Sequence, residues 1–263
     1  MRRPTAYLVV GDLAKNWRLL SIAKGIQALA YKELSNFRPL PPQKRRQAQE
    51  KFIRQTEKSL RPEGFRPLGV FAYDMVYLGL DLSVDFGLFL DPETRSYMMA
   101  SAMALKTSGL VEKIITGLRR FLGGFRVLRI ASRLSDGRIV GVIQTPAIPD
   151  YFDHSPNFIF EKASRWVSPR GIVRRHRRLL ERCLAEAPGV AVLALPSPAE
   201  VRQTEMYTNS LENEYRQSLP DLVSVRELKK MLGFNYKEWS GFILEKIALL
   251  EQLRREAEPA GRN

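Results

Sequence analysis

The chain has 263 residues, 44% of them hydrophobic, which suffices for one large domain or two small ones with a sizeable core. Lys and Arg outnumber Asp and Glu by 42 to 28, and a formal charge of +14 favours an anionic partner such as nucleic acid, an acidic membrane or an acidic protein. The single cysteine excludes an internal disulfide, and no stretch reaches the ~18 uncharged apolar residues of a membrane span. Because the apolar run after Arg3 ends at Asp12, too early for a secretory signal, we expect a cytoplasmic protein.

The positive charge is concentrated in two blocks. Residues 1–60 contain 13 basic against 4 acidic side chains, and residues 111–189 contain 15 against 7. The stretches 61–110 and 190–263 are slightly acidic, with 4 against 6 and 10 against 11. Uniform basicity would indicate a general solubility effect, whereas two blocks indicate one or two anion-binding surfaces.

Two helices are predicted in the first block. The first spans 12–35, where Asp12 is a suitable cap, and it ends before the proline-rich stretch 37–42. The second spans 43–59 and is polar nearly all round, so it is either solvated or docked onto something charged. We therefore expect residues 1–60 to form a basic helical arm.

The residues that follow predict an antiparallel sheet. Stretch 64–75 is rich in β-forming residues, and 86–103 and 125–145 read as hairpins with turns at 91–94 and 135–137. A helix over 108–124 separates the hairpins and is expected to cover one sheet face. The prediction is an α+β fold with four to five antiparallel strands built from hairpins and flanked by helices, in a domain spanning 61–196, to which 190–196 adds one more strand.

A long aromatic loop over 146–168, in which Phe158–Phe160 can form a short strand, carries the side chains that come nearest to a chemical site. Asp150, Asp153 and His154 combine carboxylates with an imidazole, but their spacing matches no metal motif, so we interpret them as a turn held by side-chain hydrogen bonds. The chain also lacks a nucleophile elbow, a Walker pattern and paired-cysteine zinc spacing. We therefore predict no catalytic residue, metal or cofactor.

A small-ligand pocket or an enzyme active site, built between the sheet and residues 151–166 of this loop, is the alternative interpretation. Its expected wall is aromatic and consists of Tyr151, Phe152, Phe158, Phe160 and Trp166.

The stretch 170–183, RGIVRRHRRLLERC, predicts an amphipathic helix with Ser168 as its cap. One stripe holds Ile172, Val173, Leu179, Leu180, Cys183 and Leu184, and it includes His176, which we expect to be half-buried and hydrogen-bonded. The arginines on the other face are either a solvated surface or an anion-binding one, since the planar guanidinium suits phosphate. The candidate anion-binding residues are Arg174, Arg175, Arg177, Arg178, Arg182, Lys44, Arg45, Arg46, Arg119 and Arg120.

Residues 197–263 predict a helical C-terminal region with helices over 197–219, 224–232 and 236–257. The last two resemble a helix-turn-helix over 224–243. Lys229 stands where a small residue is usual, and the second helix is not basic, so we favour a plain helical hairpin over a DNA-reading module.

These patterns predict a non-enzymatic protein that binds a polyanion, with nucleic acid as the leading candidate, through its two basic blocks. One alternative is a peripheral membrane protein whose N-terminal arm presents Trp17, Leu20 and Ile26 beside basic residues. Another is a subunit of a larger assembly, in which acidic protein partners cover the basic faces. DNA, RNA and the oligomeric state are not distinguished.

Overall fold

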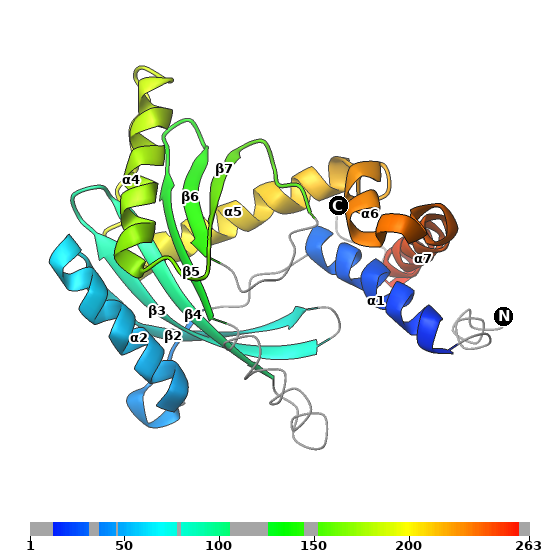
Figure 1. Ribbon diagram of the computed structural model, residues 1–263, viewed down its shortest axis with the longest axis horizontal. Coiled ribbons are helices and arrows are strands. Elements are labelled where there is room, and N and C mark those ends of the chain that lie inside the picture. Colours follow the sequence, from blue (N-terminus) through cyan, green and yellow to red (C-terminus); the bar gives the residue numbers. More distant parts are fainter. Residues whose placement is uncertain are drawn as a thin grey trace.

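The chain forms a seven-stranded sheet with helices on both faces, seen in a computed structural model that describes residues 13–31, 37–45, 47–77, 80–105, 126–144 and 152–257 (Figure 1). The strands are β1 (Arg38–Pro39), β2 (Arg66–Tyr77), β3 (Leu80–Asp91), β4 (Ser96–Leu105), β5 (Arg126–Arg133), β6 (Ile139–Gln144) and β7 (Phe158–Ala163). The helices are α1 (Leu13–Ala30), α2 (Gln47–Leu60), α4 (Pro169–Ala185), α5 (Pro198–Ser218), α6 (Val225–Leu232) and α7 (Tyr236–Ala257), with 3-10 turns η2 (Pro42–Lys44), η3 (Arg61–Glu63) and η4 (Gly233–Asn235).

The α+β class and the antiparallel sheet are confirmed, but the strand number was predicted too low. The strands lie in chain order, and every neighbouring pair is antiparallel except β6 and β7, which are parallel. The additional strands are the short edge strand β1 and strand β7, which lies inside the predicted aromatic loop. Strand β3 also begins at Leu80, earlier than predicted, and pairs with β2 along its length. The predicted strand over 190–196 is reduced to a single bridge between Leu134 and Val192.

Both predicted hairpin turns are confirmed, and local chemistry explains each. After β3, the Asp91 carboxylate accepts hydrogen bonds from the backbone N–H of Glu93 at 3.0 Å and from the hydroxyl of Thr94 at 2.7 Å. After β5, Gly137 takes a left-handed conformation with φ of +88°, and its N–H donates to the carbonyl of Leu134 at 3.1 Å.

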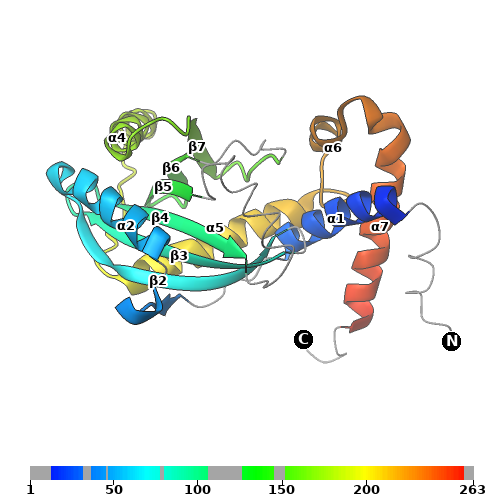
Figure 2. The same ribbon diagram turned by 60° about the horizontal axis from the view of Figure 1, so that its bottom comes forward.

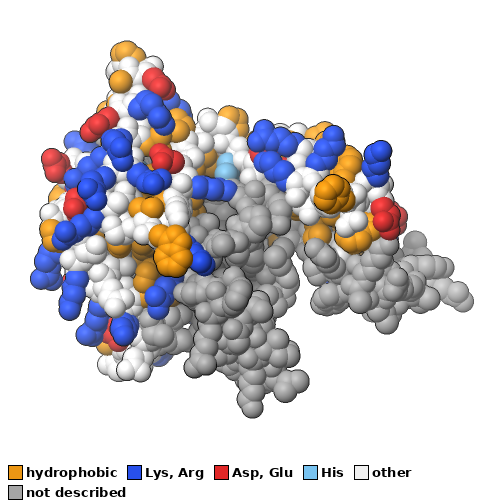
Figure 3. All heavy atoms as spheres, viewed as in Figure 1, with side chains coloured by type: hydrophobic (Ala, Val, Ile, Leu, Met, Phe, Trp, Pro, Cys, Tyr) orange, Lys and Arg blue, Asp and Glu red, His pale blue; other side chains and the backbone are white. Residues whose placement is uncertain are grey.

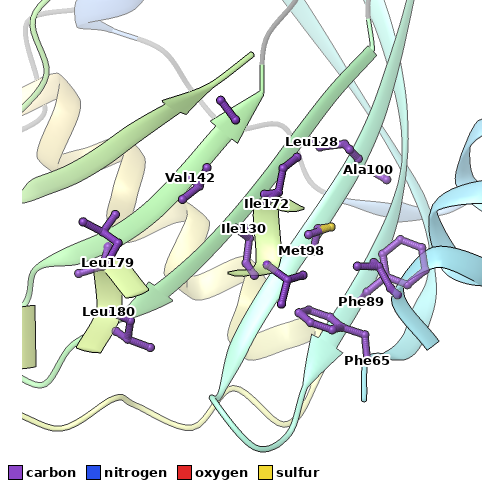
Figure 4. Packing of buried hydrophobic residues seen from close by; sticks show 14 of the residues in the cluster. Phe65, Phe89, Met98, Ala100, Leu128, Ile130, Val142, Ile172, Leu179 and Leu180 are labelled. Atoms are coloured by element: carbon purple, nitrogen blue, oxygen red, sulfur yellow. The ribbon is translucent and has the colours of Figure 1, made fainter. Parts of the chain in front are cut away.

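Side chains alternate along the strands, so each sheet face has its own core. On one face, the apolar side chains of α4 and α2 pack against strand residues such as Met98, Ile130 and Val142 (Figure 4). On the opposite face, α5 packs against a cluster that contains Phe86 and Tyr97. Figure 2 shows α2 and α4 together on one side of the sheet. The predicted covering helix over 108–124 lies outside the described residues.

A third cluster joins α1, α6 and α7 beside the sheet. Ile26, Leu228 and Ile243 are almost completely buried in it, and α1 also contacts α5. By contrast, α2 packs on β3 and β4. The two helices of the predicted N-terminal arm therefore lie in different places, and the arm is only partly matched. The predicted C-terminal helices are observed as α5, α6 and α7.

A buried ion pair connects this helical cluster to α5. The side chains of Arg216 and Glu227 are 1% and 0% exposed, and Nη1 lies 2.6 Å from Oε1. The same Oε1 accepts the backbone N–H of Asp153 at 2.6 Å, and Arg216 donates to the Asp153 carbonyl. Burial of these charges is compensated because each one meets several partners.

None of the helices in the described part of the chain combines the length and apolar content needed to cross a lipid bilayer.

Candidate functional site

Helix α4 is built as its sequence predicts. Ser168 caps it by accepting the backbone N–H of Gly171 at 3.2 Å. The stripe from Ile172 to Cys183 is buried against the sheet, which directs the arginines to the flanks and the outer side. This packing fixes the helix, so the positions of its basic side chains follow from the core.

His176 is a core residue and does not reach solvent. It is 0% exposed, and its Nε2 lies 3.3 Å from both the Ser132 hydroxyl and the Val140 carbonyl. Burial lowers the pKa of His176 to about 4, against the opposing effects of the Val140 hydrogen bond and the Asp91 charge. The imidazole is therefore neutral at physiological pH and more deeply buried than predicted. Cys183, about two turns further along the same stripe, is also buried, and burial raises the pKa of its thiol.

The arginines of α4 divide into two groups. Arg177 holds the helix in place, because its guanidinium lies 3.1 Å from the buried Asp91 carboxylate and 3.1 Å from the Glu63 carbonyl. Arg175 pairs with Glu161 on β7 at 3.4 Å. Arg174, Arg178 and Arg182 are exposed, and no ion pair to them is observed among the described residues.

The other candidate anion-binding residues also differ in exposure and partners. Lys44 is exposed in η2. Arg45 is half-buried, donates from Nε to the Leu40 carbonyl at 3.1 Å, and lies 3.9 Å from Glu50. Arg46, Arg119 and Arg120 lie outside the described residues.

The two basic blocks meet where α2 and α4 pack side by side on one sheet face. Arg170 of α4 donates to the carbonyl of Ser59 in α2 at 3.1 Å, and Arg177 reaches η3. Residues 47–63 and 169–185 together contain 10 basic and 4 acidic side chains. Figure 3 shows Lys and Arg side chains gathered over this part of the molecule. We call these residues, with the preceding turn η2, the α2–α4 surface. Its exposed cations that form no ion pair among the described residues are Lys44, Lys51, Lys58, Arg174, Arg178 and Arg182, whereas exposed Arg54, Arg61 and Arg170 each lie near a glutamate.

An exposed tryptophan adjoins this surface. Trp166 lies two residues before the α4 cap and is 80% exposed, and the Arg165 guanidinium lies 4.5 Å from the centre of its ring. The sequence predicted Trp166 as part of a pocket wall, which is not where it lies. Phe152 is also turned away, because its ring stacks beneath Arg216 at 4.9 Å. Tyr151 is outside the described residues.

The loop that carries Asp153 and His154 is held in place by side-chain contacts to α5 and α6. Lys230 donates to Asp153 at 2.9 Å, and the His154 ring nitrogen Nδ1 lies 2.8 Å from Glu212 on α5. Among the described residues, no group of three or more His, Cys, Asp or Glu side chains is placed to hold a metal ion. Asp150 lies outside the described residues.

The segment 224–243, which resembles a helix-turn-helix in sequence, forms a pair of helices packed against the rest of the chain. Helices α6 and α7 are joined by η4, and Ile243 and Ile247 of α7 are buried in the cluster with α1. The interfacial arm predicted for membrane binding also contributes to this cluster, since Ile26 is 0% exposed. In this conformation Ile26 is therefore not available to a bilayer.

Comparisons of the chain with protein-family models, with curated proteins and with solved structures found no match. The functional argument therefore rests on the geometry described above.

Proposed function

We propose that this chain is a non-enzymatic, cytoplasmic protein that binds nucleic acid through the α2–α4 surface. The observation that carries the proposal is the meeting of the two basic blocks on one sheet face, with exposed Trp166 beside them. The single buried cysteine is compatible with a reducing compartment.

The exposed cations suit a phosphate backbone. Each Lys or Arg that meets a phosphate releases condensed counterions, so six contacts give a salt slope of about −5 on duplex DNA. Affinity then falls about 10³-fold between roughly 50 and 200 mM salt. A base stacked on Trp166 would add about 1–3 kcal/mol on a single strand, where bases are accessible.

The division of the arginines narrows the set of contact residues. Arg177 and Arg175 already neutralise acidic side chains, so their role in the proposal is to hold α4 in position. The side chains proposed to contact phosphate are those of Arg174, Arg178 and Arg182 on α4, together with the lysines of the α2–α4 surface.

The test compares two variants that lose the same charge. One changes Arg174, Arg178 and Arg182 to Gln, and the control changes exposed Lys229, Lys237 and Arg255 on α6 and α7 to Gln. Binding of a labelled single strand, a duplex and acidic vesicles is measured by fluorescence anisotropy or co-sedimentation across a salt series. We expect the first variant to reduce the salt slope by about 3 and the control to leave the slope almost unchanged.

Three outcomes contradict the proposal. Equal loss in both variants would mean that net charge alone attracts the polymer. Binding to acidic vesicles without binding to nucleic acid would indicate a membrane partner. Binding to neither at low salt would leave the surface to an acidic protein partner in a larger assembly.

A further inference from the structure

The aromatic side chains around β7 have two different surroundings. Phe158 and Phe160 line a cavity of about 250 Å³ against α5, in which the carboxylates of Glu205 and Glu212 already have partners. Trp166 is not part of the wall of this cavity, and it is 80% exposed. Because burial of a tryptophan ring is strongly favourable, a ring left in water on a fixed backbone is a candidate contact for a partner.

The backbone on both sides of Trp166 is fixed from the sheet. Gln144, the last residue of β6, is buried, and its Nε2 donates to the carbonyl oxygens of Ser164 at 2.9 Å and Val167 at 2.7 Å. These two residues flank Arg165 and Trp166. The backbone N–H of Val167 also donates to the Ser164 carbonyl at 2.9 Å, which closes the turn. One buried amide therefore holds both ends of the turn that carries Trp166.

Helix α4 holds the same turn from its other side. Val167 packs against the core between α4 and the sheet, and a Cβ on Gly171 would come within 2.7 Å of its Cγ1. The glycine therefore permits a close approach of the turn to the helix, which Ser168 caps directly after the turn. An exposed tryptophan on so fixed a backbone loses little conformational entropy when a partner covers it.

The surroundings of the indole ring select a partner that is both flat and anionic. The Arg165 guanidinium lies 4.5 Å from the ring centre and covers one ring face as a cation–π pair. Since 80% of the residue is exposed, the other face is open to water. Arg174 and Arg178 of α4 are exposed beyond it. A nucleobase stacked on the open face would bring its phosphates towards these cations, which an uncharged apolar partner could not use.

The cations of α4 continue from this turn as a row. Arg174, Arg178 and Arg182 follow one another at four-residue intervals, so each lies about 6 Å further along the helix axis. Of the exposed side chains between Arg174 and Arg182, only Glu181 is acidic. The helix rises about 21 Å from Ser168 to Arg182. At about 3.4 Å per nucleotide, a strand of about six nucleotides covers this length.

The packing of α4 is unsuited to reading a duplex. Its N-terminal half lies against α2 and η3, where Arg170 donates to the Ser59 carbonyl and Arg177 to the Glu63 carbonyl, each at 3.1 Å, and the sheet lies beneath it (Figure 2). Two packed helices, with axes about 8–10 Å apart, are together about 20 Å wide, whereas the major groove is about 12 Å wide. This half of α4 can therefore follow a phosphate backbone but cannot enter the groove. Bases within a duplex are also stacked on one another and closed to Trp166.

We propose that the nucleic acid held by the α2–α4 surface is a single strand, with an unpaired base stacked on Trp166 and its phosphates along α4. This inference rests on the proposed function and adds to it the strand state and the side chain that recognises it. Every base has a flat π face, so stacking tolerates all four. The site therefore distinguishes a single strand from a duplex and not one sequence from another.

The test is fluorescence anisotropy of the full chain with a labelled strand of about 20 nucleotides, alone and paired with its complement. The strand is supplied as DNA and as RNA, and a preference for the unpaired strand in either form supports the inference. At roughly 200 mM salt, where phosphate contacts are weakened, we expect the single strand to bind at least about fivefold tighter than the duplex. Equal or tighter binding of the duplex in both forms would overturn the inference.

Variants locate the stacked base. Trp166→Leu should weaken single-strand binding about 5- to 100-fold, the loss expected for one stacked base, and change duplex binding less than about twofold. Trp166→Phe keeps an aromatic face and should retain most of the affinity. The matched control is Phe234→Leu, which removes a fully exposed ring on η4 and should leave both affinities unchanged. Because both rings are exposed, the urea midpoint should stay the same in all three variants.

The outcomes separate this inference from the proposed function. Unchanged single-strand binding in Trp166→Leu, equal losses for strand and duplex, or an equal loss in Phe234→Leu would refute the stacking site and leave nucleic-acid binding by the α2–α4 surface standing. Absence of binding of strand and duplex alike by the unmodified chain would contradict the proposed function itself, and the inference would fail with it.

Discussion

The buried Arg216–Glu227 pair allows a sharp test of how the helical cluster is held to the sheet. In Glu227→Gln, the fully buried guanidinium of Arg216 loses its counter-charge. Glu227 also accepts the backbone N–H groups of Asp153 and Ser224, each at 2.6 Å, and Gln retains only one carbonyl oxygen for them. Breaking a buried pair by removing one partner costs about 3–5 kcal/mol, a large share of the roughly 5–15 kcal/mol that stabilises a domain.

Urea unfolding, followed by circular dichroism and tryptophan fluorescence, measures this loss. The control is Glu245→Gln on α7, because that side chain is 69% exposed and its ion-pair partner, Lys246, is its sequence neighbour. We expect the control to lose less than about 0.5 kcal/mol. A second change, Arg216→Met, should restore part of the loss caused by Glu227→Gln, since it removes the unpaired charge. A loss below about 1 kcal/mol for Glu227→Gln would refute the structural role of the pair.

Three further perturbations follow from the α4 packing. The pKa of His176 is about 4 in the folded chain, against the ordinary value of 6.5 in the unfolded chain. As pH falls from 6.5 towards 4, the unfolded chain therefore takes up a proton on this imidazole that the folded chain does not. Stability should therefore fall by on the order of 3 kcal/mol over this window, and urea midpoints of His176→Met should show a shallower decline. Arg177→Met should lower the free energy of unfolding by about 2–4 kcal/mol, because Asp91 stays buried without its ion-pair partner. Arg178→Met should change the free energy of unfolding by less than about 0.5 kcal/mol and weaken only nucleic-acid binding. Cys183 should react with a thiol reagent at pH 8 far more slowly in the folded chain than in urea, and equal rates would contradict its burial.

The sequence predicted best the elements that short-range signals specify. The apolar stripe of α4, its Ser168 cap and the turn at Gly137 each depend on residues within a few positions of one another. The capping boxes observed at Ser197 of α5 and Ser224 of α6 likewise join residues only three positions apart. Strand β7 was predicted only as a short strand at Phe158–Phe160, and it extends to Ala163 because polar Glu161 and Lys162, which interrupt the apolar pattern, also belong to it.

The roles of the charged residues could not be read from the sequence, because their partners are distant along the chain. Arg177 differs from Arg178 only through Asp91 and Glu63, which α4 meets after the sheet has formed. The buried polar residues of α5, Thr204, Glu205 and Thr208, were missed for a related reason. Hydrophobic periodicity searches for apolar stripes, and Glu205 is buried only because Arg129 stands opposite it on β5.

Exposed and buried cations of this chain respond to salt in physically different ways. Cations of the α2–α4 surface are exposed, so their attraction to phosphates is screened within a Debye length of about 10 Å at 0.1 M salt. The Arg129 side chain is only 20% exposed and works in a region of lower dielectric, where salt screens much less. Raising salt from about 50 to 200 mM should therefore reduce nucleic-acid affinity about 10³-fold and leave the ion pair between Arg129 and Glu205 almost unchanged. If nucleic-acid affinity fell less than about tenfold over this range, binding would not depend on phosphate contacts of the exposed cations, because about six such contacts require a far steeper loss.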